Sequence, residues 1–194
     1  MEQSSRVKTI VFLIALIAVA AVGLFWLTLR RVDSSWLITL PDLISREYRA
    51  DMSGVELLSV EDIYNDIVLL PARDNQLRIE YLENNFEHYA LSADGQSIGC
   101  RFIPGDHYFK YGLPMRSGDS RLVIYLPREY RGGLALGTTS GDISVTLPGC
   151  AADYTLLIDS ASGMLSLPEG CDSGSRIVTL TSSSGNISVT CEGE

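Results

Sequence analysis

The sequence predicts an all-β fold, a small β-solenoid of about 20–22-residue turns, preceded by one N-terminal transmembrane helix. Two observations predict it. A Ser-Gly pair recurs at a fixed spacing together with matching apolar positions, and an uncharged apolar run stands near the amino terminus. A fixed repeat of this length is typical of stacked architectures. An apolar run of this length is typical of a membrane span.

The repeat lies between residues 134 and 189, where Ser140-Gly141, Ser162-Gly163 and Ser184-Gly185 stand 22 residues apart. Apolar and polar residues alternate within each copy, which indicates short strands separated by a turn. Stacking the copies in parallel gives the solenoid. An antiparallel meander or sandwich is the alternative, because short strands punctuated by glycine fit it as well. Four apolar columns recur: Leu134, Leu156 and Val178; Leu136, Ile158 and Leu180; Ile143, Leu165 and Ile187; Val145, Leu167 and Val189.

The chain upstream of the repeat has the same strand-like character. Nothing from 51 to 194 shows a sustained helical period, so the predicted β-domain covers residues 51–194. A Leu-Pro pair at 126–127, preceded by Ser117-Gly118-Asp119, extends the repeat upstream to a fourth copy. Turn formers separate the earlier strand-like segments, which are 54–60, 66–71, 76–81 and 89–92.

Residues 10–29 contain no charge, and Thr28 is their one polar residue. As a helix rising ~1.5 Å per residue, the run spans ~30 Å, the thickness of the hydrocarbon core of a bilayer. A cleaved signal peptide with a small-residue site at 18–20 is the alternative, but the apolar run continues well beyond that site. We therefore expect a short tail at 1–9, a transmembrane helix at 10–29 that contacts the lipid bilayer, and a juxtamembrane connector at 30–50.

This arrangement predicts a single-pass protein of the cell membrane. The flanking positive charges are nearly balanced, and long folded domains translocate largely regardless of them. We therefore expect the C-terminal domain to be extracytoplasmic.

Composition and motifs narrow the function classes. The formal net charge is −9, and an acidic protein is a poor partner for nucleic acid phosphates. The two histidines, His88 and His107, stand in no motif with a nucleophile, and the Ser-Gly serines lack the strand-to-helix elbow of a hydrolase. Asp142 is replaced by Met164 and Asn186 in the other copies, so we interpret it as a turn residue rather than a cation ligand. We expect no enzyme, no metal and no cofactor.

Taken in order, the segments 55–60, 66–71, 77–81 and 122–127 and the Ser-Gly-Asp-Ile-Ser-Val copies from Ser140 resemble the putative adhesin family of bacterial proteins. The resemblance covers about residues 51–191. It implies a small β-solenoid carried on the outer side of a membrane. The molecular function of that family is unknown, and no catalytic residues come with the resemblance.

Three of the four cysteines, Cys150, Cys171 and Cys191, stand at corresponding corners of successive copies. Side chains stacked at such corners are ~4.8 Å apart, which is within reach of a disulfide. Reduced stacked thiols and one disulfide between neighbouring copies are both open, and Cys100 is left over or pairs with whichever of the three remains. A metal or redox site is a minor alternative, because no close Cys or His pair is present.

These observations predict a membrane-anchored, non-enzymatic envelope protein for adhesion, scaffolding or interaction, whose partner is another envelope protein or a surface polymer. A sensory or regulatory membrane protein of an envelope-stress or signalling system is the alternative. The aromatic patch at 107–111 is interpreted as a cover of the core, or else as an exposed recognition surface.

Overall fold

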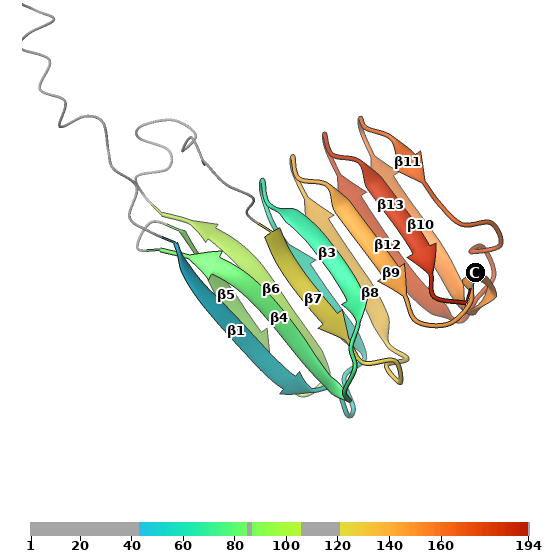
Figure 1. Cartoon of the computed structure of the whole chain (residues 1–194), viewed down its shortest axis with the longest axis horizontal. Helices are drawn as coiled ribbons and strands as arrows, with labels where there is room; N and C mark the ends of the chain where they lie inside the picture. The colour runs from blue at the N-terminus through green and yellow to red at the C-terminus, as the bar shows by residue number, and fades with distance from the viewer. Residues whose placement is uncertain (1–42, 85–86, 106–120, 194) are drawn as a thin grey trace, which may run out of the picture. The chain divides into compact units, whose positions relative to one another are not determined.

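The computed structural model describes residues 43–84, 87–105 and 121–193. They form two β-sheets (Figure 1). Sheet A has seven strands in the order β1-β4-β7-β3-β9-β13-β11, and sheet B has six in the order β10-β12-β8-β2-β6-β5. The strands are β1 (Ile44–Asp51), β2 (Leu57–Glu61), β3 (Asp66–Pro71), β4 (Gln76–Glu83), β5 (Glu87–Ala93), β6 (Ser97–Pro104), β7 (Arg121–Leu126), β8 (Gly133–Thr138), β9 (Ile143–Leu147), β10 (Tyr154–Ser160), β11 (Leu165–Ser166), β12 (Arg176–Ser182) and β13 (Ile187–Cys191).

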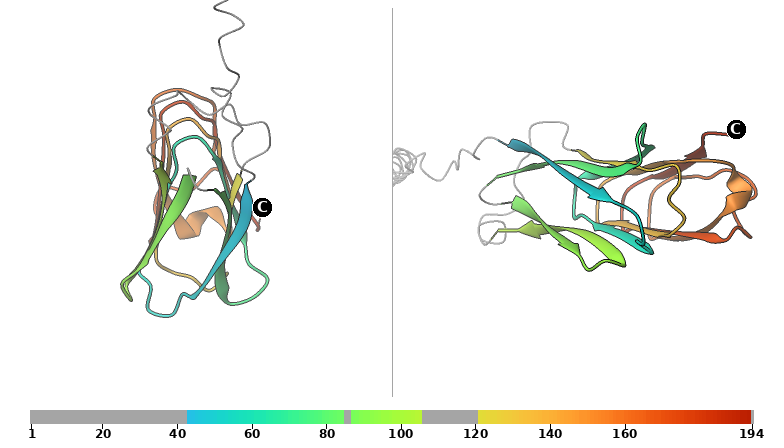
Figure 2. Two further views of the ribbon diagram at one scale, coloured as in Figure 1. Left: turned by 90° about the vertical axis from the view of Figure 1, so that its left-hand side faces the viewer. Right: turned by 90° about the horizontal axis from the view of Figure 1, so that it is seen from below.

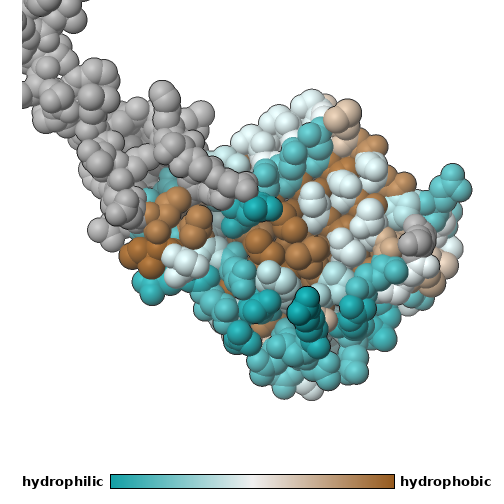
Figure 3. Space-filling view, in the orientation of Figure 1, coloured by the Kyte–Doolittle hydropathy of each residue, from teal (hydrophilic) through white to brown (hydrophobic). Residues whose placement is uncertain are grey.

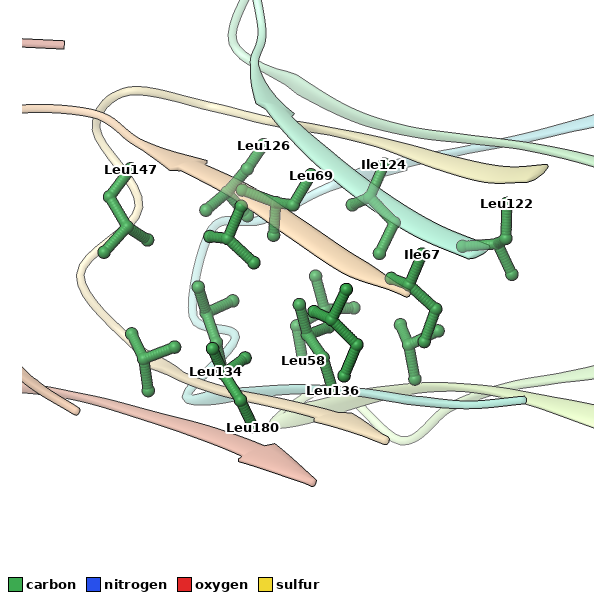
Figure 4. Close-up of a cluster of buried hydrophobic side chains, with 14 of the residues drawn as sticks. Leu58, Ile67, Leu69, Leu122, Ile124, Leu126, Leu134, Leu136, Leu147 and Leu180 are labelled. Atoms are coloured by element: carbon green, nitrogen blue, oxygen red, sulfur yellow. The ribbon is translucent and has the colours of Figure 1, made fainter. Parts of the chain in front are cut away.

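The two sheets face each other across one apolar core (Figure 2). Successive side chains of a strand point to opposite faces, so the apolar positions of each strand turn inward together. The alternation read from the sequence therefore becomes burial on one face only. Figure 4 shows the meeting of the two inner faces, with these fully buried side chains among those labelled: Ile67, Leu69, Leu122 and Ile124 from sheet A, and Leu58, Leu136 and Leu180 from sheet B.

Parallel pairing runs through the middle of both sheets and builds a stack of layers. Each layer has one strand in each sheet. Along the stack the layers are β6–β7, β2–β3, β8–β9, β12–β13 and β10–β11. The predicted columns are present, since Val178 lies opposite both Leu134 and Leu156.

The order of the layers overturns the predicted solenoid. In a solenoid each coil lies next to the coil that follows it in sequence. Here β8–β9 lies next to β12–β13, and β10–β11, which follows β8–β9 in the chain, lies beyond them. The other end of the stack is antiparallel, because β1 and β4 in sheet A and β5 in sheet B pair in that sense. The fold consists of two facing mixed sheets, and neither the solenoid nor the purely antiparallel alternative describes it.

The Ser-Gly turns lie at one corner of the stack, where each one contacts the layer before it. The hydroxyl of Ser140 donates to the carbonyl oxygen of Ile63 at 3.1 Å, and that of Ser184 donates to the carbonyl oxygen of Thr139 at 3.1 Å. Ser162 does the same toward the carbonyl oxygen of Ser183 at 3.0 Å. The serine of each copy therefore joins two layers, which explains why it recurs with the period of the stack.

A second series of contacts, which we call the corner ladder, consists of Asp66, Asp142, Asn186 and Met164. The side-chain oxygen of Asp66 accepts the backbone N–H of Asp142 at 2.8 Å, and that of Asp142 accepts the N–H of Asn186 at 2.8 Å. The Asn186 side chain then accepts the N–H of Met164 at 2.9 Å. Asp142 directly follows the Ser-Gly turn, and its carboxylate bonds to the next layer, a contact that the sequence did not predict. Met164 has no acceptor to continue the ladder, and it stands in the last layer.

The described residues contain no helix that is long and apolar enough to cross a bilayer. The predicted transmembrane helix at residues 10–29 lies outside the described residues, as do the tail at 1–9 and most of the connector at 30–50. The finding on helices corrects the predicted fold class, with its transmembrane helix, and the predicted single-pass location in the cell membrane. Residues 44–50 of the predicted connector form most of β1 in sheet A.

Candidate binding surface

The outer face of sheet B is hollowed across its middle strands. Small outward-facing residues of β2, β8 and β12 leave an open hollow of ≈ 400 Å³. Gly137 and Ala135 occupy positions at which larger side chains would fill the space, so the backbone itself forms part of the floor. The lining residues are Ser59, Val60, Glu61, Asp62, Ala135, Leu136, Gly137, Thr138, Thr139, Thr179, Thr181 and Ser183.

A second hollow of ≈ 290 Å³ adjoins the first and shares Ser59 and Glu61 with it. It continues across β6 and β5, where Ala90, Ser92 and Gly99 again supply small outward positions. We call the two hollows together the sheet B trough. The trough runs across the strands, from β12 to β5, and neighbouring strands lie ~4.8 Å apart, so it is ~19 Å long.

Hydroxyl groups dominate the polar lining of the trough. Ser59 and Thr179 are half-buried and Thr181 is exposed, and all three project from the outer face, since their neighbours Leu58, Val60 and Leu180 fill the core. Among the described residues, the hydroxyls of Ser59, Thr179 and Thr181 make no hydrogen bond to another protein group. A hydroxyl both donates and accepts, so this lining suits a ligand that offers both kinds of group.

One ion pair stands where the two hollows meet. Nε of Arg101 donates to Oε2 of Glu61 at 2.7 Å, from β6 to the neighbouring β2. The side chains are 66% and 54% exposed, so water screens their attraction and the pair adds little stability. Their polar atoms remain accessible to a ligand in the trough.

A buried polar network lies beside the middle of the trough, directly after β2. Asp62 is 6% exposed, and its Oδ1 accepts the backbone N–H groups of Ile63, Tyr64 and Asn65 at 2.7, 3.0 and 2.8 Å. The side-chain amide of Asn65 donates to both Asp62 oxygens, and the Tyr89 hydroxyl donates to Oδ2 at 2.5 Å. Without these bonds the buried Asp62 carboxylate would have no hydrogen-bond donors, which is costly. The network therefore holds the β2–β3 turn in one conformation.

The sequence did not predict this network. The available signal was an Asp followed three residues later by an Asn, between two predicted strands, which is typical of a side-chain-stabilised turn.

The outer face of sheet A differs from the trough. Val68, Leu70 and Val123 project from its middle strands and are half-buried. Figure 3 shows this face, on which brown apolar residues lie between pale ones and teal residues gather along the lower rim. Thr146 and Thr190 on this face bond to each other through their hydroxyls at 3.3 Å. None of the hollows described above lies on this face.

The three cysteines predicted to stack at one corner, Cys150, Cys171 and Cys191, do not occupy equivalent positions in their layers. Cys191 ends β13 opposite Leu147, which is three residues before Cys150. Cys150 is exposed, and its Sγ lies 3.6 Å from Oδ2 of Asp153. Cys171 is buried between β11 and β12, where its carbonyl oxygen accepts the N–H of Leu156 at 3.0 Å. None of these three cysteines is in a disulfide, and a disulfide between copies stays a prediction for the oxidised protein.

Cys100 lies in the core below the trough and is 1% exposed. Burial raises the pKa of its thiol to about 12, and the nearby Asp62 carboxylate acts in the same direction. At neutral pH it is therefore a protonated, unreactive thiol.

The sequence also singles out His88 and an aromatic patch. His88 is exposed on β5, and the aromatic patch at 107–111 lies outside the described residues. In the part of the chain that the structure describes, no group of three or more His, Cys, Asp or Glu side chains is placed to hold a metal ion.

No protein-family model matches the chain. No curated protein matches it either. Among solved structures, the chain is similar to the crystal structure of a putative cell adhesion protein from Clostridium sporogenes ATCC 15579. The similarity covers 78% of this chain and 100% of that chain, with 10% sequence identity and a TM-score of 0.43. The neighbour's name agrees with part of the predicted resemblance to the putative adhesin family. An identity and a TM-score this low do not show that the chain belongs to that family.

Proposed function

We propose that this protein is a non-enzymatic binding protein whose sheet B trough holds a neutral, hydroxyl-rich polymer such as a surface polysaccharide. The observation that carries the proposal is the trough, whose hollows of ≈ 400 and ≈ 290 Å³ adjoin and whose lining includes the hydroxyls of Ser59, Thr179 and Thr181, which bond to no protein group among the described residues. A polysaccharide presents donors and acceptors along its whole length, which is what a row of hydroxyls can match.

The shape of the trough favours a polymer over a small molecule. Sites for small molecules enclose most of the ligand surface, whereas this trough is open along ~19 Å and can contact only one side of its ligand. Affinity must therefore come from contacts repeated along a chain. A peptide strand is a poorer candidate, because strand addition requires a free sheet edge and the trough lies on a sheet face.

Charge favours a neutral polymer. The chain has a formal net charge of −9, so its field repels polyanions at low salt. Within the trough the one exposed acidic side chain of β2, Glu61, is already paired with Arg101. A neutral ligand keeps this pair intact and avoids the repulsion.

The test is binding of the full-length protein to immobilised neutral polysaccharides, with mannan, dextran and cellulose as probes and an acidic polysaccharide beside them. Thr181→Arg places a long side chain in the trough, and Thr190→Arg makes the same change at an exposed threonine on the outer face of sheet A. We expect Thr181→Arg to weaken binding at least about tenfold and Thr190→Arg to leave it unchanged.

Two results would contradict the proposal. One is the absence of binding to every neutral probe. The other is equal weakening by the two arginine variants, which would remove the trough from the interaction. Shortening of a bound polysaccharide during the assay, measured as new reducing ends, would show that the protein is an enzyme after all.

A further inference from the structure

The last layer of the stack leaves the apolar core open at that end. Leu165 in β11 occupies the same column as Ile187 in the neighbouring layer, yet Leu165 is 51% exposed and Ile187 is 0% exposed. Leu167 is 41% exposed, two residues further along the same inward-facing series. In sheet B, Leu156 and Ile158 of β10 are only half-buried, whereas Val178 and Leu180 opposite them are buried. Inward-facing residues that are buried in every inner layer are thus open to solvent in this one.

Both sheets also end here with free strand edges. In the described part of the chain, β13 is the one strand beside β11 and β12 is the one strand beside β10, which also forms an isolated antiparallel bridge from Thr155 to Asp172. The segment around Cys171–Gly174 crosses the first residues of β10, where the N–H of Leu156 bonds to Cys171 and the hydroxyl of Thr155 bonds to Gly174. The rest of β10, from Leu157 to Ser160, has no strand beside it among the described residues. This end of the domain, from Leu156 to Leu167, is called the open end below.

The open end has little of the charge that protects many edge strands, although β11 is only two residues long and Pro168 follows it. Natural edge strands carry charges, prolines or bulges that prevent pairing with another chain. Residues 154–168 contain one charged residue, Asp159, in a chain that has 24 Asp and Glu and 15 Lys and Arg. At the opposite end of the stack, β1 carries Arg46, Glu47, Arg49 and Asp51, and Arg46 bonds to Glu83 of β4 at 2.7 Å. One edge is therefore protected by charge and the other is not.

We propose that the open end is the docking surface for the same end of a second copy of this chain. A two-fold axis perpendicular to the sheets would bring β10 beside β10 and β11 beside β11, both antiparallel. The two copies would then share continuous sheets and one continuous core. Such an interface is self-complementary, as two-fold dimers require.

A second copy fits this end better than a single peptide strand does. The open end consists of two free edges, one in each sheet, with exposed core residues between them. An added strand would pair with one edge and leave the other edge and the core open. A second copy presents two edges at the same separation, because its layers have the same geometry, and it brings its own apolar residues to the gap.

The distribution of charge also directs two copies to this end. Copies with a net charge of −9 repel each other over most of their surfaces, and they repel least where charge is sparse. Met164, which is 75% exposed, lies at the rim of the open end, where the inner layers carry Asp142 and Asn186. Met164 adds to the exposed apolar residues Leu165 and Leu167 at this end, and a contiguous exposed apolar patch is typical of an interaction surface.

Sedimentation equilibrium of the full-length protein tests the proposal. Leu165→Lys places a charge in the open end, and Ile44→Lys is the matched control, since Ile44 is 53% exposed on β1 and Leu165 is 51% exposed. We expect the wild type and Ile44→Lys to form dimers and Leu165→Lys to dissociate at least about tenfold more readily. Thermal unfolding of both variants, followed by circular dichroism, reports whether each chain is folded.

Backbone hydrogen exchange gives an independent readout. In the dimer, the amides of β10 and β11 should exchange more slowly as the protein concentration rises, and those of β1 should not change. A wild-type protein that stays monomeric would overturn the proposal. So would association that Leu165→Lys and Ile44→Lys weaken equally, or exchange in β10 that does not depend on concentration, since a segment of the same chain or another partner would then cover the open end.

Discussion

Replacing Gly185 by alanine tests whether the corner of the stack is as close-packed as the structure indicates. A Cβ atom at this position would lie 1.8 Å from the carbonyl oxygen of Gly141 and 2.6 Å from its carbonyl carbon. Ordinary contacts begin at 3.4 Å, so the two layers would have to separate by about 1.6 Å, a third of the ~4.8 Å between strands. Backbone atoms of a paired sheet cannot move this far without losing their hydrogen bonds.

The expected loss follows from the bonds at that corner. The N–H and the hydroxyl of Ser184 both donate to the oxygen of Thr139 at 3.1 Å, and the N–H of Asn186 donates to Asp142 at 2.8 Å. Three such bonds at about 1 kcal/mol each, with at least about 1 kcal/mol of overpacking, lower the free energy of unfolding by about 4 kcal/mol. That is a large share of the roughly 5–15 kcal/mol that stabilises a typical domain.

Urea unfolding followed by far-ultraviolet circular dichroism measures this difference. Gly137→Ala is the control, because its Cβ would meet nothing closer than Thr181 at 4.0 Å, and it should change the free energy of unfolding by less than about 0.5 kcal/mol. If Gly185→Ala were as stable as Gly137→Ala, the layers would not approach each other as described, and the assignment of the Ser-Gly turns to the corner of the stack would be wrong.

Three further outcomes follow from the contacts described above. Asn186→Ala removes the acceptor for the N–H of Met164 at 2.9 Å and should cost about 1 kcal/mol in urea unfolding, whereas Ser188→Ala, in the strand that follows, should cost less than about 0.5 kcal/mol. A maleimide at neutral pH should label the exposed Cys150 rapidly and the buried Cys100 only after unfolding, as read by mass spectrometry of peptides. Burial raises the pKa of Cys100 to about 12 in the folded protein. The stability gained by keeping this thiol protonated is therefore complete below the unfolded pKa, and it is lost as the pH rises from the unfolded pKa toward the folded one. Urea midpoints should therefore fall between about pH 9 and about pH 11, and Cys100→Val should reduce that fall.

The sequence predicted which residues share a column but not which copies are neighbours. Val178 has the same partners in the same register whether its copy lies beside that of Leu156, that of Leu134 or both, because every copy offers an apolar residue there. Column spacing therefore contains no information on layer order. Met164 is the one residue that indicates the layer order. Its side chain offers no acceptor for a further layer, so the corner ladder ends at this copy, which is the last layer.

The trough could not be predicted for a different reason. Its residues are small and outward-facing, and a pattern of Ser, Thr, Ala and Gly at alternate positions is also what any solvated strand shows. What distinguishes Ser59, Thr179 and Thr181 is that they come from strands far apart in sequence and meet on one face. The pairing of β2 with β8 brings them together, and nothing local to either strand specifies that pairing.

The order of the layers has a consequence for how the chain is completed during synthesis. Both strands of the last layer, β10 and β11, pair only with β12 and β13, which are made after them. Until β12 and β13, within residues 176–191, have emerged, β10 and β11 have no neighbouring strand in either sheet. A chain that stops short of residue 176 therefore loses two layers of its core instead of one, and the partly made protein exposes two unpaired apolar strands on the ribosome.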